Sequence, residues 1–523
     1  MQAPDRKAGR LERLLRLFAD VRGGEGSTVL LLALNVFLLL TAYYFIKPLR
    51  EALILEEQGA EIKSYASALQ ALILLGAVPA YGALANRLPR RRLIDTVTVF
   101  FAACLGAFFL LGRAGVPLGI VFFLWVGIFN LMVVAQFWAF ANDLYTNQEG
   151  ERLFPLVQFG ASAGAVFGSV VVGQLIEPLG IWAPMLIAAG ILLLSLGITR
   201  VVDARERQRT ERGRARAEST DVAPAATGEF RMDTGEFRNL RDEVRRALQR
   251  MEEEELARQR GEEPPPAPAE PERTPEPEPE PEPEPGPDRD RRGRPAGEKL
   301  LPGRGAFAMV FRTRYLLLIA LLILLLNWVN TTGEYILGRV VEDTAREAVA
   351  AGTAGGLTVA QFIGDFYSNF FSVVNAAGLL IQLFLVSRIV KWLGIRRAIL
   401  VLPFIALGAY GLLAFFPVLA AVRWAKTAEN ATDYSLMNTV RQTLFLPMTR
   451  EQKYKAKQAI DAFFWRAGDV LSAAVVWVGT TWLAMGAADF AKFNIVLVLV
   501  WLAISFLIGR EYRALVREGR PPA

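Results

Sequence analysis

Charged side chains interrupt several long apolar stretches of this sequence, and they are the residues best placed to do chemistry. Lys47 and Arg50 end the first stretch, and Glu334 lies in the seventh. The tenth stretch carries five charges at roughly helical spacing, namely Arg423, Lys426, Glu429, Asp433 and Arg441. An ionisable group within a membrane span costs several kcal/mol unless it is paired or faces water. Each of these residues is therefore a candidate for a functional site.

Several arginines and lysines around one central cavity suit an anionic, phosphorylated substrate, because guanidinium groups bind phosphate oxygens in pairs. We expect this cavity role for the charges of the first and seventh stretches and for the cations of the tenth: Lys47, Arg50, Glu334, Arg423, Lys426 and Arg441. Three further charges in the eighth and eleventh stretches are better explained as ion pairs between helices: Asp365, Arg466 and Asp469.

Other kinds of chemistry are excluded by composition. The chain has no histidine and only one cysteine, Cys104, so disulfides, zinc clusters, histidine proton relays and histidine-based triads are ruled out. We expect no cofactor and no metal. Neither half contains the G-x-x-x-x-G-K-[ST] loop that cradles nucleotide phosphates in motor enzymes. A nucleotide would therefore be cargo and not fuel, and an enzyme is the least favoured class.

The elements that must hold these charges are membrane-spanning helices. Of the 523 residues, 53% are hydrophobic, and a hydrocarbon core about 30 Å thick requires about 20 apolar residues per helix. Six such stretches occur in the first half of the chain, at 28–46, 65–85, 93–111, 118–141, 154–176 and 181–198. Six more occur in the second half, at 315–337, 361–386, 397–416, 418–447, 459–485 and 490–508. The pattern predicts an all-α membrane protein of about twelve spans.

Charge also predicts the orientation and the domains. Lysines and arginines concentrate in the even-numbered loops and at both ends of the chain. This pattern predicts that those segments lie on the cytoplasmic side of an inner membrane. We predict a cytoplasmic amphipathic segment at 1–27, six-helix halves at 28–200 and 306–510, and a cytoplasmic tail at 511–523. Residues 201–305 are charged and rich in proline and glutamate, which predicts a disordered cytoplasmic linker.

Short motifs repeat between the two halves. Residues 82–91 read G-A-L-A-N-R-L-P-R-R, which resembles the G-x-x-x-D-R-x-G-R-R loop of the major facilitator superfamily. A basic turn at 391–397 follows the eighth stretch at the equivalent place. Many secondary transporters bind substrate near mid-membrane between two such halves. The fold expected is therefore major-facilitator-like, with two six-helix halves.

A more specific resemblance is carried by motifs in both halves. Residues 46–51 read I-K-P-L-R-E, residues 137–142 read F-W-A-F-A-N, residues 149–156 read E-G-E-R-L-F-P-L, and residues 455–461 read K-A-K-Q-A-I-D. These are similar to elements of the bacterial and plastid ATP/ADP translocase family. The resemblance implies ATP:ADP antiport, with five charged residues needed for nucleotide binding and exchange: Lys47, Arg50, Glu149, Glu334 and Lys457. The family's second cation falls at Leu53 here, and its tenth-span lysine–glutamate pair reads Arg441–Gln442.

The leading functional hypothesis is a secondary transporter that exchanges nucleotides or related organic phosphates by alternating access. A second is a proton-driven permease or effluxer for another solute, with Glu334 or Asp365 carrying the proton. A third is a scaffold that does not transport, although buried charges would serve no purpose in it. The partners expected are a small anionic substrate and the lipid bilayer, without nucleic acid, and the sequence leaves the oligomeric state open.

Overall fold

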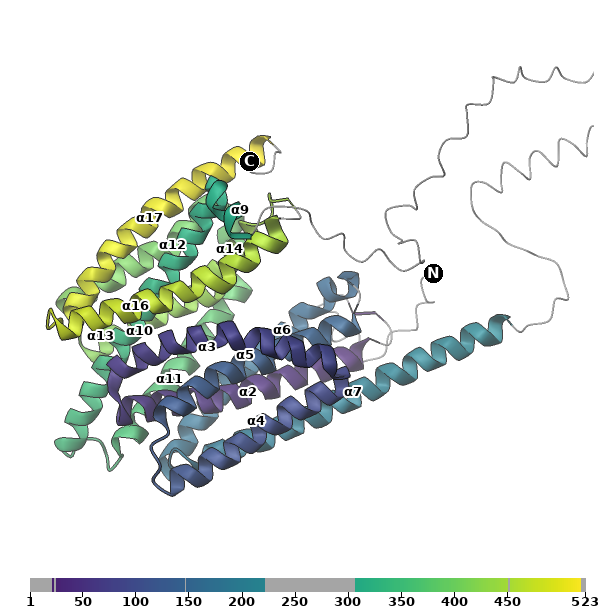
Figure 1. The fold of residues 1–523 in the computed structure, drawn as a ribbon, viewed down its shortest axis with the longest axis horizontal. Coiled ribbons are helices and arrows are strands. Elements are labelled where there is room, and N and C mark those ends of the chain that lie inside the picture. Colours follow the sequence, from purple (N-terminus) through teal and green to yellow (C-terminus); the bar gives the residue numbers. More distant parts are fainter. Residues whose placement is uncertain (1–20, 23–24, 146, 222–305, 450–451, 519–523) are drawn as a thin grey trace, which may run out of the picture. The chain divides into compact units, whose positions relative to one another are not determined.

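The structure is a computed structural model that describes residues 21–22, 25–145, 147–221, 306–449 and 452–518. Every regular element in these ranges is a helix, which confirms the predicted all-α class. The helices of the first half lie side by side (Figure 1). They are α2 (Gly26–Glu57), α3 (Gly59–Arg87), α4 (Arg90–Arg113), α5 (Gly119–Leu144), α6 (Asn147–Leu179) and α7 (Ala183–Asp221).

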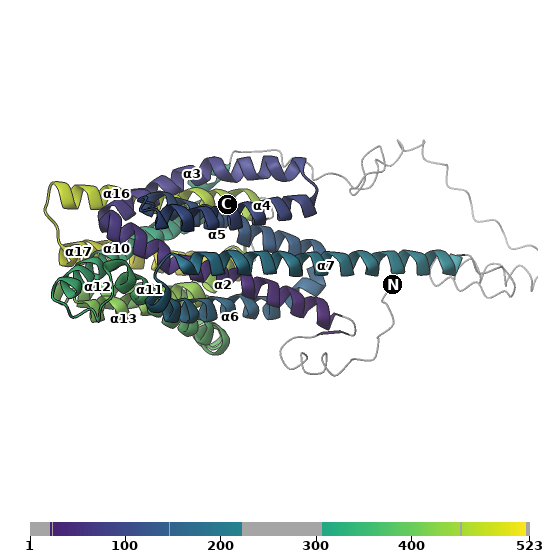
Figure 2. The ribbon, with the colours of Figure 1, turned by 90° about the horizontal axis from the view of Figure 1, so that it is seen from below.

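The second half contains π-helical turns, labelled η, between its α-helices. Its first elements are α9 (Ala306–Arg312), α10 (Arg314–Ala350), α11 (Val359–Leu380), η1 (Ile381–Leu385) and α12 (Val386–Phe415). They are followed by α13 (Leu419–Thr432), η2 (Asp433–Met437), α14 (Asn438–Thr443), η3 (Gln452–Ala456), α15 (Lys457–Ala459), η4 (Ile460–Phe464), α16 (Trp465–Thr481) and α17 (Ala487–Glu518). Figure 2 shows the long helices of both halves running alongside one another.

Within the described residues, ten helices are long and apolar enough to cross a membrane, compared with the twelve spans predicted. One of the ten, Val359–Phe415, contains the eighth and ninth predicted spans, which are separated only by a bend at Gly394 with φ of 67°. The tenth predicted span corresponds to α13, η2 and α14. This segment is not among the ten long apolar helices, because it is charged and divided into short helices. Its residues are nevertheless helical from Leu419 to Thr443.

The predicted domain boundaries differ from the helix ends. Helix α7 continues to Asp221, beyond residue 200 where the first half was predicted to end, and α17 continues to Glu518 through much of the predicted tail. The chain divides into a unit made of residues 1–208 and 304–523 and a second unit, 209–303, of which only the end of α7 is described. The predicted N-terminal segment up to residue 20 and most of the predicted linker lie outside the described residues.

Helices α2 and α6 form the closest helix pair of the first half, because glycines on α6 let the two backbones approach. Gly160, Gly164 and Gly168 occur every fourth residue, and a Cβ at Gly164 would lie 2.8 Å from the Cα of Phe37. The hydroxyl of Thr41 donates a hydrogen bond to the carbonyl of Gly164 at 3.3 Å. This small-residue stripe positions α2, which carries Lys47 and Arg50, against α6.

We expect Gly164→Ala to destabilise the fold by about 1–3 kcal/mol, because the added methyl group would overlap the backbone of α2. The matched control is Gly190→Ala on α7, where a Cβ would meet no atom within 4 Å. Thermal unfolding of the two purified variants in detergent measures the difference. Equal unfolding temperatures would show that α2 and α6 do not depend on this close approach.

Candidate functional site

Four charged residues of the first half gather near the end of α2 and the start of α3. Lys47, Arg50 and Glu51 lie on α2, and Lys63 lies one turn into α3. The buried carboxylate of Glu51 forms ion pairs with Lys63, at 2.7 Å, and with Arg50. Lys63 also donates a long hydrogen bond of 3.5 Å to the hydroxyl of Tyr367 on α11, so this group of charges reaches the second half.

A second group of charges surrounds Lys426 on α13. Its ammonium donates to the side-chain oxygen of Asn330 at 2.9 Å and to Glu429 at 3.0 Å, and it lies 3.6 Å from Glu334. Glu334 also accepts a hydrogen bond of 3.0 Å from the side chain of Asn430, and Glu429 accepts one of 3.0 Å from the hydroxyl of Tyr410. Lys426 is 1% exposed. Its charge is balanced by carboxylates of the protein, so it is not available to pair with an anionic substrate.

Cations outnumber carboxylates in these two groups, and Lys47 is the cation left over. The ammonium of Lys47 lies 3.9 Å from the ring centre of Phe371 on α11 and 5.1 Å from that of Tyr44. No carboxylate of the described residues lies within ion-pair distance of it. Aromatic rings stabilise a cation weakly compared with a carboxylate, which leaves Lys47 able to bind an anion.

A cavity of about 340 Å³ adjoins Lys47. Tyr44 both lines this cavity and contacts the lysine ammonium with its ring. The walls come from α2, α6, α11 with η1, and η2 with α14, so both halves contribute. The lining residues are Leu40, Tyr44, Gln158, Ala161, Ser162, Ala165, Val374, Asn375, Gly378, Leu379, Gln382, Tyr434 and Asn438.

Two further cations lie beside the last helical turns of the tenth span. Arg441 donates to the side-chain oxygen of Asn438, a cavity residue, at 3.2 Å, and stacks 4.7 Å from the ring centre of Trp465. Lys457 donates to the side-chain oxygen of Gln442 at 2.7 Å. Within the part of the chain that the structure describes, neither cation forms an ion pair. Lys47 and Arg441 therefore mark opposite ends of the cavity.

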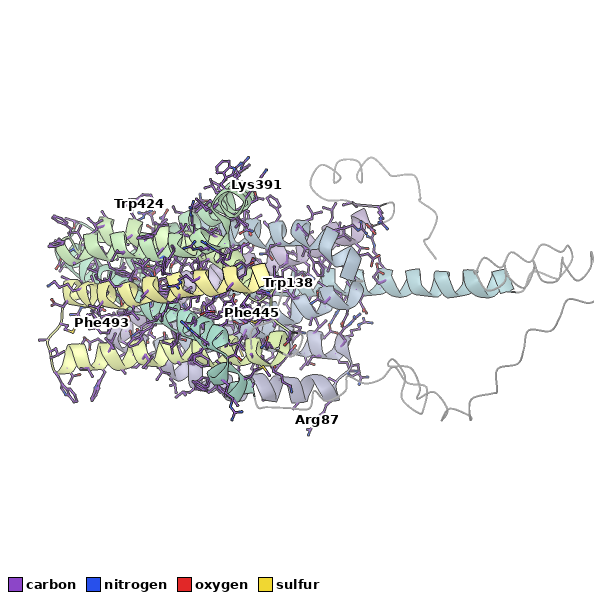
Figure 3. The ribbon with its side chains drawn as sticks, turned by 90° about the horizontal axis from the view of Figure 1, so that it is seen from above. Arg87, Trp138, Lys391, Trp424, Phe445 and Phe493 are labelled. Carbon is purple, nitrogen blue, oxygen red and sulfur yellow. The ribbon has the colours of Figure 1, made fainter. Side chains whose placement is uncertain are left out.

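Two predicted site residues lie elsewhere. Arg423 lies 5.9 Å and 5.7 Å from the rings of Phe366 and Trp424, and Trp424 points outward from the helices in Figure 3. Glu149 is in the first turn of α6, nine residues before the cavity residue Gln158, which is about 13 Å along a helix. The structure does not group these two residues with Lys47.

The charges predicted to pair between helices behave in different ways. Asp469 on α16 accepts hydrogen bonds from Asn327 and Thr331 on α10, at 2.8 Å and 2.9 Å. Its ion pair with Arg466, at 3.5 Å, lies within its own helix. Asp365 accepts from Asn369 one turn later on α11. Of these three residues, Asp469 thus joins two helices, through its hydrogen bonds to α10.

Lys63 is the important residue that sequence reasoning missed. The second span was predicted to start at residue 65, which left Lys63 in a loop, whereas α3 starts at Gly59. The signal that could have revealed it is Gly59 itself, which has φ of 84° and separates α2 from α3 by a single turn. A helix that starts there carries Lys63 into the interior.

The two halves are joined at the end of the helices where α2 meets α3 and α10 meets α11. Glu342 on α10 accepts a hydrogen bond from the backbone N–H of Ala60 at 2.9 Å. Arg346 donates to the carbonyl of Glu56 at 3.2 Å, and Gln361 donates to the carbonyl of Ile176 at 3.4 Å. The cavity lies on the other side of Lys47, so the halves are closed at one end and hollow toward the other.

We expect Glu342→Ala to loosen this closed end, because the N–H groups of the first turn of α3 lose a buried acceptor from the opposite half. Amide hydrogen exchange in that turn should become about tenfold faster. The control is Asp343→Ala, which removes an exposed neighbouring carboxylate whose partner is Arg339 on the same helix. If both variants exchange like the native chain, Glu342 does not hold the halves together.

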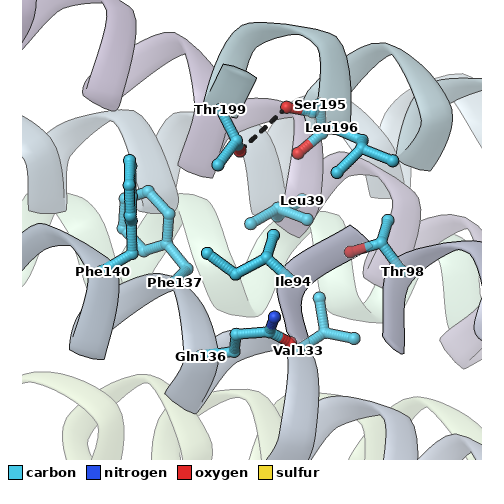
Figure 4. Close-up of a pocket in the computed structure, with 10 residues that line it drawn as sticks. All are labelled: Leu39, Ile94, Thr98, Val133, Gln136, Phe137, Phe140, Ser195, Leu196 and Thr199. Atoms are coloured by element: carbon cyan, nitrogen blue, oxygen red, sulfur yellow. Dashed lines mark hydrogen bonds between the residues drawn. The ribbon is translucent and has the colours of Figure 1, made fainter. Parts of the chain in front are cut away.

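A second, smaller cavity of about 20 Å³ lies within the first half (Figure 4). Gln136 lines it, is 7% exposed, and has no hydrogen-bond partner for either side-chain amide atom. Thr199, on the opposite wall, donates to the carbonyl of Ser195 at 3.1 Å. This volume is enough for about one water molecule. The small cavity shares no lining residue with the larger one.

Comparison with known proteins agrees with this architecture. A POT family transporter in complex with a thioalcohol conjugated peptide is 11% identical, with a TM-score of 0.56 over 95% of this chain and 98% of that chain. The nucleoside transporter NupG is 11% identical, with a TM-score of 0.52 over 94% and 99%. A bacterial homologue of the iron transporter ferroportin, in an inward-facing state, is 12% identical, with a TM-score of 0.52 over 93% and 98%.

At such low identities these similarities establish the fold and nothing about the cargo. No curated protein sequence matches the chain. The family description of the Major Facilitator Superfamily matches residues 32–432, which is most of the sequence and includes parts of both halves. The chain therefore belongs to the Major Facilitator Superfamily and has the fold of its membrane transporters.

Proposed function

We propose that this transporter exchanges nucleotides or related organic phosphates across the inner membrane. The observation that supports this most is the set of cations without carboxylate partners, Lys47 beside the cavity and Arg441 and Lys457 near its other end. Of these three, Lys47 is buried, and a buried cation left without an anion is strongly unfavourable. A phosphorylated cargo would supply the missing negative charge.

The arrangement of the halves supports alternating access as the mechanism. The contacts of Glu342 and Arg346 close one end, while the cavity lies toward the end at which α7 leaves the first half and α9 enters the second. With both chain termini and the linker in the cytoplasm, as we propose, the cavity would face the cytoplasm. Rocking of the two halves about these central charges would expose Lys47 to the other side.

The test is exchange in liposomes that contain the purified chain. Labelled ADP should enter liposomes preloaded with ATP in a saturable manner and should enter empty liposomes far more slowly. Lys457→Ala should reduce the rate, because among the described residues its ammonium contacts Gln442 and the ring of Phe445 and no carboxylate. Uptake that ignores the internal nucleotide, together with native behaviour of Lys457→Ala, would exclude nucleotide exchange.

A second candidate is a proton-coupled permease for a different solute. It is favoured by Glu334, whose side chain is 26% exposed while Glu51 and Glu429 are almost completely buried. A partly exposed carboxylate beside a lysine can accept and release a proton during transport. Uptake that follows an imposed pH gradient, ignores nucleotides and is lost in Glu334→Gln would support this candidate.

A further inference from the structure

We infer that the wall of the large cavity between α6 and α11 is a subsite for a neutral, planar, hydrogen-bonding group such as a nucleobase. The inference rests on the proposed function and adds to it the place where the uncharged part of the cargo binds. It assigns specificity to side chains that sequence analysis did not select, chiefly Asn375 and Gln382. Phosphate binding is left to the cations at the two ends of the cavity.

The first argument is the chemistry of the lining. Four residues with side-chain amides line the cavity, Gln158, Asn375, Gln382 and Asn438, and none of the described residues that line it is charged. Each amide offers both a donor and an acceptor. Nucleobases present the same alternation of donors and acceptors along their edges, and side-chain amides recognise adenine in this way in nucleic-acid complexes.

The second argument is an unused donor. The side-chain nitrogen of Asn375 is buried and makes no hydrogen bond of normal geometry to the described residues, although the hydroxyl of Tyr44 lies close to this side chain. An unpartnered buried polar group costs about 1–3 kcal/mol, so such groups in folded proteins usually serve a ligand, water or ion. Asn375 is a cavity residue, and a base bound there would provide the acceptor.

The third argument is the shape of the two walls. Helix α6 contributes only small side chains next to Gln158, namely Ala161, Ser162 and Ala165. Helix α11 and η1 line the cavity with Val374, Asn375, Gly378, Leu379 and Gln382. Tyr44 and Tyr434 also line the cavity and provide aromatic rings for stacking on a planar ligand. A wall of small residues opposite a wall that carries two amides among apolar side chains suits a flat ligand that hydrogen-bonds along its edge.

The fourth argument is local backbone geometry. Gln382 lies in the π-helical turn η1 and Tyr434 in the π-helical turn η2, and these two turns contact each other. A π-helical turn contains one more residue than an α-helical turn, and such turns occur preferentially at functional sites. Both irregular turns of the cavity wall therefore hold side chains that would contact the ligand.

The position of the charges completes the inference. Lys47 lies beyond Tyr44 at one end, and Arg441 is hydrogen-bonded to Asn438 at the other. A cargo that pairs with the cation at one end and fills this wall has an anionic end and a neutral polar body. Inorganic pyrophosphate would pair with the cations but would leave the donor of Asn375 unused.

The experiment compares the binding of ADP, pyrophosphate, ribose 5-phosphate and adenosine to the purified full-length chain by competition against labelled ADP and by ligand-induced thermal stabilisation. Asn375→Leu and, separately, Gln382→Leu should weaken ADP and adenosine about tenfold or more and leave pyrophosphate unchanged. Lys47→Met should weaken ADP and pyrophosphate. The matched control is Gln136→Leu, a buried amide in the small cavity, which should bind all four compounds like the native chain.

The outcomes separate this inference from the proposed function. If pyrophosphate and ribose 5-phosphate bind as tightly as ADP, and the two leucine variants affect all three equally, the subsite is wrong while the phosphate site stands. If ADP and pyrophosphate both fail to bind, the proposed function is wrong. The subsite is then decided by adenosine alone: it holds if adenosine binds and both leucine variants weaken it, and otherwise it is overturned. Using two variants guards against misfolding of either.

Discussion

Lys47→Met is expected to abolish ADP exchange while leaving the chain folded. Methionine retains the length and the apolar contact with the rings of Phe371 and Tyr44, but it cannot pair with a phosphate. Loss of one partner of a buried charge pair costs about 2–5 kcal/mol, which corresponds to about thirtyfold or more in affinity. Labelled ADP uptake into ATP-loaded liposomes and the affinity for ADP in detergent measure the effect.

The control for this prediction is Lys492→Met. Lys492 lies on α17, is largely exposed, and pairs with the exposed Asp489. The Lys492→Met variant should therefore exchange ADP at the native rate. Lys47→Arg should keep part of the activity, because the positive charge remains. Native affinity for ADP in Lys47→Met would show that the surplus cation of the central charges does not bind the cargo.

Lys426→Met is expected to give the largest loss of stability among single substitutions. It removes the cation that lies between Glu334 and Glu429 and leaves two carboxylates and the amide of Asn330 without their common partner. Breaking a buried ion pair in this way costs about 3–5 kcal/mol. The measurement is thermal unfolding of the purified variant in detergent, together with the fraction of monodisperse protein.

The double variant Lys426→Met with Glu429→Gln should recover much of this stability. Glu429 is the more buried of the two carboxylates that lose Lys426, and glutamine in its place carries no charge. Comparing the two single variants with the double variant isolates the interaction between the residues. Additive losses would mean that Lys426 and Glu429 do not stabilise each other.

Much of the fold was predictable because the membrane imposes a simple rule on composition. The apolar stretches identified the helices, and the basic turn at residues 391–397 placed the boundary between the eighth and ninth spans where the structure has the bend at Gly394. Helix ends were less predictable. Helix α7 continues to Asp221 because a helix can extend into water on charged residues, where hydropathy no longer marks its end.

The candidate site was predictable only in part, for a physical reason. The sequence indicated that Lys47 and Glu334 cannot face lipid, and both lie near the cavity or its charges. It could not show that Glu334 of another helix would help to neutralise Lys426 while Lys47 would have no carboxylate partner among the described residues. That distinction depends on contacts between residues of separate helices. Neutral residues such as Asn375 escaped notice because an amide in a span costs too little to stand out.

The bend at Gly394 has a mechanical consequence. The eighth and ninth spans are joined by a single non-helical residue, so no spare length of chain separates them. A shift of η1, which holds the cavity residue Gln382, must displace the start of the next span. Arg396, just after the bend, lies 5.9 Å from the ring of Phe506 on α17. We therefore expect closure of the cavity at η1 to move the last helix of the chain as well.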